Sequence, residues 1–322
     1  MAAFANFKSA APLPSQDAES VAEPMPNAAL PVDEHEEKAK ARPPASVPAE
    51  DEESPPGMQS AEHEYVRANC IFSGKLKTFA ELSGVPLLEQ FASEYNPDPA
   101  GAERAVSGLL LFGPSGTGKT AGAQAIAHEL NARLYKMSMA DMQTRASMAR
   151  IDALFDVVQD GPQPAVIFLD EVDTLLSKSA YARCGHFATR FERFQKNVLV
   201  IGATNEPTKI SPKILFGRFE RKILVDNPSL AARRALISKQ LAQESTPANM
   251  SADDIMYVAK QLEGRSAVNI ERVVSTAVKR ALGGVDMMDF DLAIEQEPSD
   301  FDDATAKKNK QFNEQHGWRG AW

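Results

Sequence analysis

The sequence has little of what builds secreted, membrane-spanning or metal-binding proteins. Only two of its 322 residues are cysteines, Cys70 and Cys184, and their spacing fits no metal motif. No apolar run approaches the roughly 20 residues that cross a bilayer. Asp17, Glu19 and Glu23 stand where a leader peptide would be apolar or basic. We therefore expect a protein without a membrane span, from the cytoplasm or another reducing soluble compartment, the nucleus included.

Positive charge is also scarce, since the formal net charge is −9. That balance argues against nucleic acid as a general partner, although a local basic patch is compatible with it. Residues 1–60 are rich in proline, alanine and glutamate and poor in aromatic residues. Such a stretch cannot bury enough apolar area to offset its ordering entropy, so we expect a disordered acidic arm. It is either a tether for a partner or a passive tail.

A glycine-rich motif follows the apolar run Leu109–Phe112 and precedes the alanine-rich, helix-like stretch Ala121–Leu130. Its residues are Gly113, Pro114, Ser115, Gly116, Thr117, Gly118, Lys119 and Thr120. Strand, glycine loop and helix are the context that a phosphate-binding loop requires. The backbone N–H groups and the helix N-terminus attract phosphate oxygens. Lys119 is placed to reach the β- and γ-phosphates, and Thr120 to hold Mg²⁺.

Two further apolar runs end in polar side chains. Ala165–Leu169 is followed by Asp170 and Glu171, and residues 197–202 lead to Asn205. Strands of this kind alternate with helices, which predicts a doubly wound, mostly parallel α/β sheet. We expect Asp170 to bind the Mg²⁺ sphere, Glu171 to orient or deprotonate a water, and Asn205 to contact the γ-phosphate or that water.

The chain changes character after Pro228, where only helical patterns follow. Ser229, Ser251 and Ser266 are suitable N-caps for three of these helices. We therefore divide the chain beyond the arm into a large α/β nucleotide-binding domain (61–227), a small helical lid domain (228–297) and a C-terminal helix and tail (298–322). Two tryptophans close the chain, Trp318 and Trp322, which is unusual unless they dock on something.

These motifs together resemble the AAA ATPases. The glycine loop looks like their Walker A, Val166–Asp173 like their Walker B, and Gly202–Pro207 like their sensor-1 segment. Phe79–Gly84 is similar to the segment whose backbone borders adenine, which makes Ser83 and Gly84 candidate nucleotide contacts.

Two late segments refine the resemblance. Met288–Ile294 and Lys308–Gly317 are similar to the last helices of the meiotic clade, which comprises katanin, spastin, fidgetin and the ATPase that disassembles ESCRT-III. The resemblance implies ATP and Mg²⁺ as ligands and self-association into a ring or spiral, typically a hexamer. It also implies action on a protein partner, which the sequence does not name.

The chain departs from the family pattern in its arginines. Arg218 matches one of two usual arginines, while Phe216 stands where the first is expected. Arg218 is therefore our candidate for the residue that reaches a neighbour's ATP, with Arg190 and Arg221 as weaker substitutes.

The first pore loop also departs from the pattern. The segment Asp141–Met148 has no aromatic residue and no glycine, so only Met142 or Met148 could grip a threaded polypeptide.

The sequence thus predicts an ATP-hydrolysing oligomeric motor that remodels a protein. One alternative is an ATP-dependent binding or scaffold protein with weak turnover, which the two departures favour. The other is an ATPase acting on nucleic acid, against which the acidic balance and the lack of a DNA-binding motif argue.

Overall fold

The computed structural model describes residues 56–95, 108–138, 147–193 and 197–319. The expected arm, 1–60, lies outside this part of the chain except for its last five residues. Those five begin helix α1 (Pro56–Asn69).

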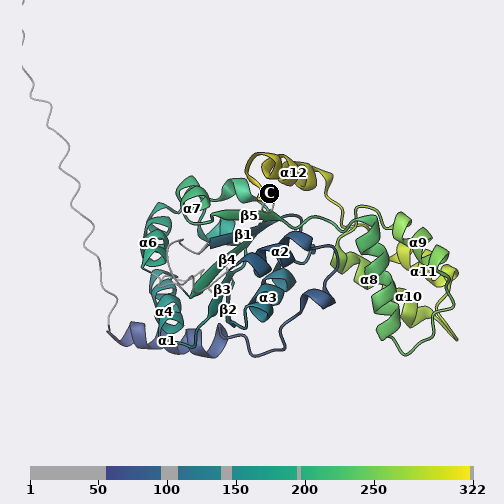
Figure 1. Cartoon of the computed structure of the whole chain (residues 1–322), viewed down its shortest axis with the longest axis horizontal. Coiled ribbons are helices and arrows are strands. Elements are labelled where there is room, and N and C mark those ends of the chain that lie inside the picture. The colour runs from purple at the N-terminus through teal and green to yellow at the C-terminus, as the bar shows by residue number, and fades with distance from the viewer. Residues whose placement is uncertain (1–55, 96–107, 139–146, 194–196, 320–322) are drawn as a thin grey trace, which may run out of the picture. The chain divides into compact units, whose positions relative to one another are not determined.

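A five-stranded parallel sheet forms the centre of the molecule, with strand order β2-β3-β4-β1-β5 (Figure 1). The strands are β1 (Gly108–Phe112), β2 (Arg133–Met137), β3 (Ala165–Leu169), β4 (Val198–Thr204) and β5 (Arg221–Leu224). Three of them, β1, β3 and β4, are buried over their whole length. This pattern of unbroken apolar strands is typical of a sheet covered on both faces. The predicted fold class is confirmed.

Alternate residues of each strand enter two separate cores, as the period of a strand requires. Leu110 and Phe112 of β1 face one core, and Leu109 and Leu111 face the other. Helices α1, α4, α6 and α7 cover the first face, and α2 and α3 the second. The covering helices are α2 (Pro86–Glu94), α3 (Lys119–Glu129), α4 (Ser147–Gln159), α5 (Val172–Leu175), α6 (Tyr181–Glu192) and α7 (Pro212–Gly217).

The four helices after β5 have a core of their own, drawn from residues between Leu236 and Ala293. They are α8 (Leu230–Gln243), α9 (Ala252–Gln261), α10 (Ala267–Arg280) and α11 (Met287–Gln296). The three expected serine caps are present. Ser229, Ser251 and Ser266 each accept a hydrogen bond from the backbone N–H three residues on. The domain boundaries drawn from the sequence stay a prediction.

The last helix, α12 (Asp303–His316), lies within the predicted C-terminal segment 298–322. It begins after Asp302, whose carboxylate accepts a hydrogen bond from the Thr305 N–H and so caps the helix. Trp318 does dock: its ring meets Phe91 edge-on at 6.1 Å, and its backbone N–H donates to the Lys222 carbonyl over 2.7 Å. Trp322 lies outside the described residues.

Helix α1 was not foreseen, because its mostly polar sequence hides the few residues that pack. Glu62 and Arg150 of α4 form an ion pair at 2.6 Å, and both side chains are largely buried. Just after α1, the Phe72 N–H donates to the Leu134 carbonyl of β2. This segment therefore covers the β2 edge of the sheet, which would otherwise offer unpaired backbone groups.

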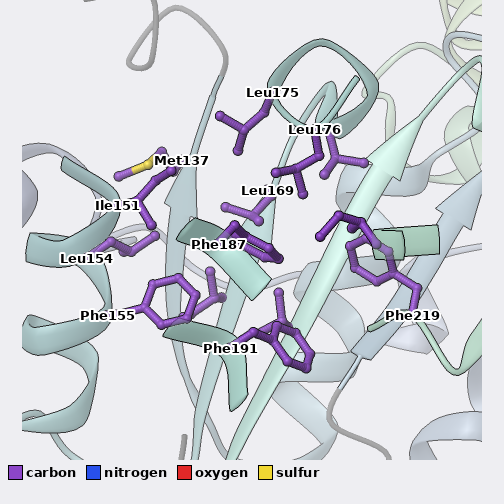
Figure 2. Packing of buried hydrophobic residues seen from close by; sticks show 14 of the residues in the cluster. Met137, Ile151, Leu154, Phe155, Leu169, Leu175, Leu176, Phe187, Phe191 and Phe219 are labelled. Carbon is purple, nitrogen blue, oxygen red and sulfur yellow. The ribbon is translucent and has the colours of Figure 1, made fainter. Parts of the chain in front are cut away.

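The first core should be sensitive to loss of a single large side chain. Phe187 of α6 is 1% exposed and packs edge-on against Phe155 at 5.6 Å, with Phe191 beside it (Figure 2). We expect Phe187→Ala to lower the free energy of unfolding by about 3–5 kcal/mol through lost burial and a cavity. Tyr181 on the same helix is 81% exposed, so Tyr181→Ala should change it by less than about 0.5 kcal/mol. Urea denaturation of both variants measures the difference, and equal effects would contradict this packing.

Candidate nucleotide-binding site

The glycine loop connects β1 to α3 and turns through conformations that favour glycine. Gly116 has φ +73°, and a Cβ there would come within 2.7 Å of the Ser266 hydroxyl. Gly118, which precedes α3, has φ +102°. The Thr117 hydroxyl closes the loop by donating to the Pro114 carbonyl over 2.9 Å. The loop therefore ends at the N-terminus of an eleven-residue helix, where N–H groups and the helix dipole attract anions.

Lys119 folds back over this loop. Its Nζ donates to the carbonyls of Gly113 and Pro114 over 2.9 and 2.6 Å. Burial lowers the pKa of Lys119 to about 8, and the nearby carboxylates of Asp170 and Asp173 oppose that shift. An ammonium has three donor hydrogens, so one stays available for a phosphate. The lowered pKa means that the charged form lacks full compensation, which an added phosphate would supply.

The two carboxylates after β3 are held differently. The Asp170 N–H donates to the Met137 carbonyl of β2, and its Oδ2 lies 4.0 Å from Lys136 Nζ. Glu171 is exposed and adopts φ +52°, a left-handed conformation that is uncommon for a residue other than glycine. Such an outlier is a reason to suspect function, because the fold must maintain it at a cost.

Asn205 lies between the glycine loop and these carboxylates. Strand β4 pairs with β1 on one side and with β3 on the other, and the Gly113 N–H donates to the Thr204 carbonyl over 3.2 Å. The Thr204 hydroxyl donates to Asp173 and accepts the Glu206 N–H at 2.9 Å. The backbone on each side of Asn205 is thus fixed, and its own side chain is exposed.

The segment expected beside adenine borders the helices that follow β5. Gly84 has φ +79°, and a Cβ there would come within 2.7 Å of Ala232 on α8. Lys239 of α8 donates to the Ala80 carbonyl over 2.8 Å. At the glycine loop, the Val268 N–H of α10 donates to the Gly116 carbonyl over 3.2 Å. Both ends of the expected nucleotide cleft are therefore linked to α8 and α10.

Comparison with protein families matches residues 109–227 to the family described as "ATPase family associated with various cellular activities (AAA)". That span runs from β1 through the glycine loop, the carboxylates and Asn205 to the end of β5. The chain carries an AAA domain. AAA domains generally bind nucleotide together with Mg²⁺.

Individual relatives agree with this assignment. Spastin from Ixodes scapularis is 33% identical over 230 residues, which are 64% of this chain and 34% of that protein. Spastin from Xenopus laevis is 31% identical over 236 residues, 66% of this chain and 38% of that protein. The ATP-dependent zinc metalloprotease FtsH of Methylibium petroleiphilum is 29% identical over 211 residues, which are 60% of this chain and 34% of that protein. The chain thus spans between a third and two fifths of these relatives.

A solved structure supports the fold. The FIGL-1 AAA domain in complex with ADP superposes with a TM-score of 0.70 at 21% sequence identity, over 81% of this chain and 98% of that one. At that identity the likeness speaks for the fold alone.

The candidate arginines of the AAA domain are engaged within their own chain. Arg218, after α7, forms an ion pair with Glu192 of α6, and its side chain is 14% exposed. Arg190 pairs with Asp152 and Asp156 of α4, and Arg221 lies over the Trp318 ring at 5.5 Å. Within the described residues, no hydrogen bond or ion pair joins an arginine to Lys119, Asp170 or Glu171.

The first pore loop of the AAA domain falls mostly outside the described residues. Met142 belongs to the undescribed stretch 139–146, and Met148, in the first turn of α4, is 43% exposed. Among the described residues, no helix is long and apolar enough to cross a membrane.

Sequence reasoning missed three contacts of this site. It did not foresee Lys136 beside Asp170, Glu192 on Arg218, or Asn309 of α12, whose amide donates to the Asn205 carbonyl over 3.2 Å. The first follows from the pairing of β2 with β3, and the other two join residues 26 and 104 positions apart. A sequence motif does not predict contacts between residues so far apart in the chain.

The lowered pKa of Lys119 predicts that the AAA domain takes up a proton when it binds ADP at alkaline pH. Free Lys119 loses its proton above a pKa of about 8, whereas phosphate charge favours the protonated form. ADP affinity should therefore fall by at least about tenfold between about pH 7.5 and about pH 9.5. Calorimetry in two buffers of different ionisation enthalpy measures the uptake, which should approach one proton at the higher pH. A constant affinity would show that Lys119 does not face the phosphates.

Proposed function

We propose that this protein hydrolyses ATP with Mg²⁺ and works as an oligomer that remodels a protein partner. The single observation that carries the proposal is that the glycine loop before Lys119, Asp170 and Asn205 follow three adjacent strands. Strand β4 lies between β1 and β3, and the Gly113–Thr204 hydrogen bond ties the loop to the Asn205 segment. Polar groups at the carboxyl edge of a parallel sheet are the usual place for a ligand.

Each side chain has a distinct role in this proposal. Lys119 binds the β- and γ-phosphates, and Ser83 and Gly84 border the base. Thr120 and Asp170 would hold Mg²⁺, whose charge would neutralise the phosphate oxygens. Glu171, exposed at the strand end, accepts a proton from the attacking water or orients it. Asn205 aligns that water or the γ-phosphate.

The oligomer follows from the charge that this site lacks. Phosphoryl transfer is accelerated roughly 10³–10⁵-fold by an arginine that stabilises transition-state charge. Within the described residues, Arg218 points to Glu192 rather than to its own Lys119 or Glu171. A neighbouring copy that presents Arg218 would complete the site. AAA family members typically assemble into rings, which supports a hexamer or an open spiral here.

The second candidate function is an ATP-dependent binding or scaffold protein with weak turnover. The ion pair between Arg218 and Glu192 favours it, because a sequestered guanidinium would leave each site short of positive charge. Steady-state hydrolysis with and without a candidate partner separates the two functions.

Glu171→Gln tests the role of the exposed carboxylate. The amide has the same shape but cannot accept a proton, so we expect ATP binding within about threefold of wild type and hydrolysis at least about 10²-fold slower. ATP binding by fluorescence and phosphate release measure the two effects. Asp173→Asn serves as the matched control. Asp173 accepts a hydrogen bond from the Thr204 hydroxyl, so this substitution should also lower the stability of the protein. Wild-type turnover by Glu171→Gln would place the base elsewhere.

A mixing experiment tests whether Arg218 acts on a neighbour. Arg218→Ala and Glu171→Gln should each be inactive alone while still binding ATP. In mixed oligomers, some interfaces pair an intact Glu171 with an intact Arg218, so part of the hydrolysis should return. Arg218→Lys should restore little of the hydrolysis that Arg218→Ala loses, because the lysine ammonium is a point charge and lacks the planar fork of the guanidinium.

The outcome that contradicts this role is equally clear. Full activity of Arg218→Ala alone would remove Arg218 from the mechanism. No recovery in mixed oligomers that demonstrably form would show that Arg218 does not act between chains.

A further inference from the structure

The C-terminal helix α12 lies across β5 and the turn Pro207–Lys209, beside the proposed site (Figure 1). Its buried side chains are Ala306, Asn309 and Phe312. Phe312 meets Phe112, the last residue before the glycine loop, edge-on at 5.0 Å between ring centres. Lys310 lies 3.7 Å from Asp226, just after β5. The helix therefore touches the chain next to the phosphate loop and next to Asn205.

Asn309 is unusual among these contacts, because it is a polar side chain that is only 1% exposed. Its Nδ2 donates to the backbone carbonyl of Asn205 over 3.2 Å. A buried amide costs free energy unless it is paired, so a residue kept only for packing here would more simply be apolar. The hydrogen bond from Asn309 to the Asn205 carbonyl is therefore the feature whose role needs an explanation.

Anchoring of the helix does not explain it. Phe312 on Phe112, the Lys310–Asp226 pair and the Trp318 N–H on the Lys222 carbonyl all hold the C-terminal segment independently. The buried apolar residues of α12 are Ala306 and Phe312. The helix should stay docked without the Asn309 amide.

Orientation of Asn205 does explain it. The hydroxyl of Thr204 binds Asp173 and the Glu206 N–H, which fixes the backbone on both sides of Asn205. The Asn309 amide adds a donor at the Asn205 carbonyl and so fixes the peptide plane that follows this residue. The direction of the exposed Asn205 side chain depends on that backbone. An error of about 1 Å at a reacting group can cost about 10² in rate.

We propose that Asn309 is a positioning residue for ATP hydrolysis. Its amide sets the orientation of Asn205 and makes the geometry of the site depend on the docking of α12. The inference rests on the proposed function, in which Asn205 aligns the attacking water or the γ-phosphate.

Asn309→Asp, made in the 322-residue chain, tests the proposal. The substitution keeps the shape of the side chain and removes the hydrogen-bond donor. We expect kcat to fall about tenfold, because the Asn205 backbone would lose one of the hydrogen bonds that orient it. The KM for ATP and the affinity for ADP should stay within about twofold, since the phosphate loop is untouched. Asn313→Asp, the same substitution one turn further along α12, is the matched control and should leave kcat unchanged.

Asn309→Leu guards against an effect of the introduced charge, because leucine fits an apolar interface and cannot donate. It should lower kcat to a similar extent while the melting temperature stays near that of wild type. Wild-type kcat in Asn309→Leu would overturn the proposal. Unfolding of both variants would also overturn it, because Asn309 would then be an anchor of the helix.

Combination with Asn205→Ala identifies the route of the effect. If Asn309 acts through Asn205, adding Asn309→Leu to Asn205→Ala should lower kcat by less than about twofold further. A further tenfold loss would overturn the proposal while leaving the role of Asn205 intact. Wild-type hydrolysis by Asn205→Ala alone would instead refute the role of Asn205 in the proposed function, and the inference about Asn309 with it.

Discussion

The parallel pairing of β4 between β1 and β3 is the constraint on which the candidate site depends. Phe112 lies opposite Thr204, and Leu169 lies opposite Gly202. The glycine loop, Asn205 and the two carboxylates therefore follow neighbouring strands at the same edge of the sheet. About 90 residues of sequence separate the glycine loop from Asn205. Because all three strands are buried, a shift in register would turn apolar side chains away from their core. The register that satisfies the core also assembles the site.

Charge at the site is balanced for a ligand that brings negative charge. Lys119 is partly buried, and its Nζ donates to two carbonyls. Desolvation lowers its pKa to about 8 despite the carboxylates of Asp170 and Asp173. Desolvation disfavours the ammonium until phosphate oxygens surround it. Lys136, 4.0 Å from Asp170, offsets part of the acidic charge at the proposed Mg²⁺ position. Among the described residues, Lys119 donates to two carbonyls, which leaves one ammonium hydrogen for a phosphate oxygen, so site and substrate are complementary in charge.

The sequence predicted the elements whose signal is local. Unbroken apolar runs marked β1, β3 and β4. The glycine loop indicated Lys119 and Thr120, because a phosphate-binding loop has those residue types in that order. Serine caps located the starts of three helices. Helix α1 was missed because it is mostly polar and is held by tertiary contacts, among them the buried Val66 and the ion pair of Glu62 with Arg150, a residue 88 positions away. Asn309 and Glu192 were missed for the same physical reason, since their roles arise from tertiary contacts that no spacing encodes.

The pair between Arg218 and Glu192 bears on whether the site can be completed by a neighbour. Glu192 is 59% exposed, and an ion pair with one partner in water contributes about 0–1 kcal/mol. An arginine that stabilises phosphoryl transfer by roughly 10³–10⁵ supplies about 4–7 kcal/mol. The second quantity exceeds the first several-fold, so Glu192 can hold the guanidinium in an isolated chain without preventing its transfer to a neighbour's phosphate. The ion pair therefore counts as weak support for low turnover. Together with the carbonyls of Ala188 and Gly217, which also accept hydrogen bonds from Arg218, it holds the guanidinium in one orientation.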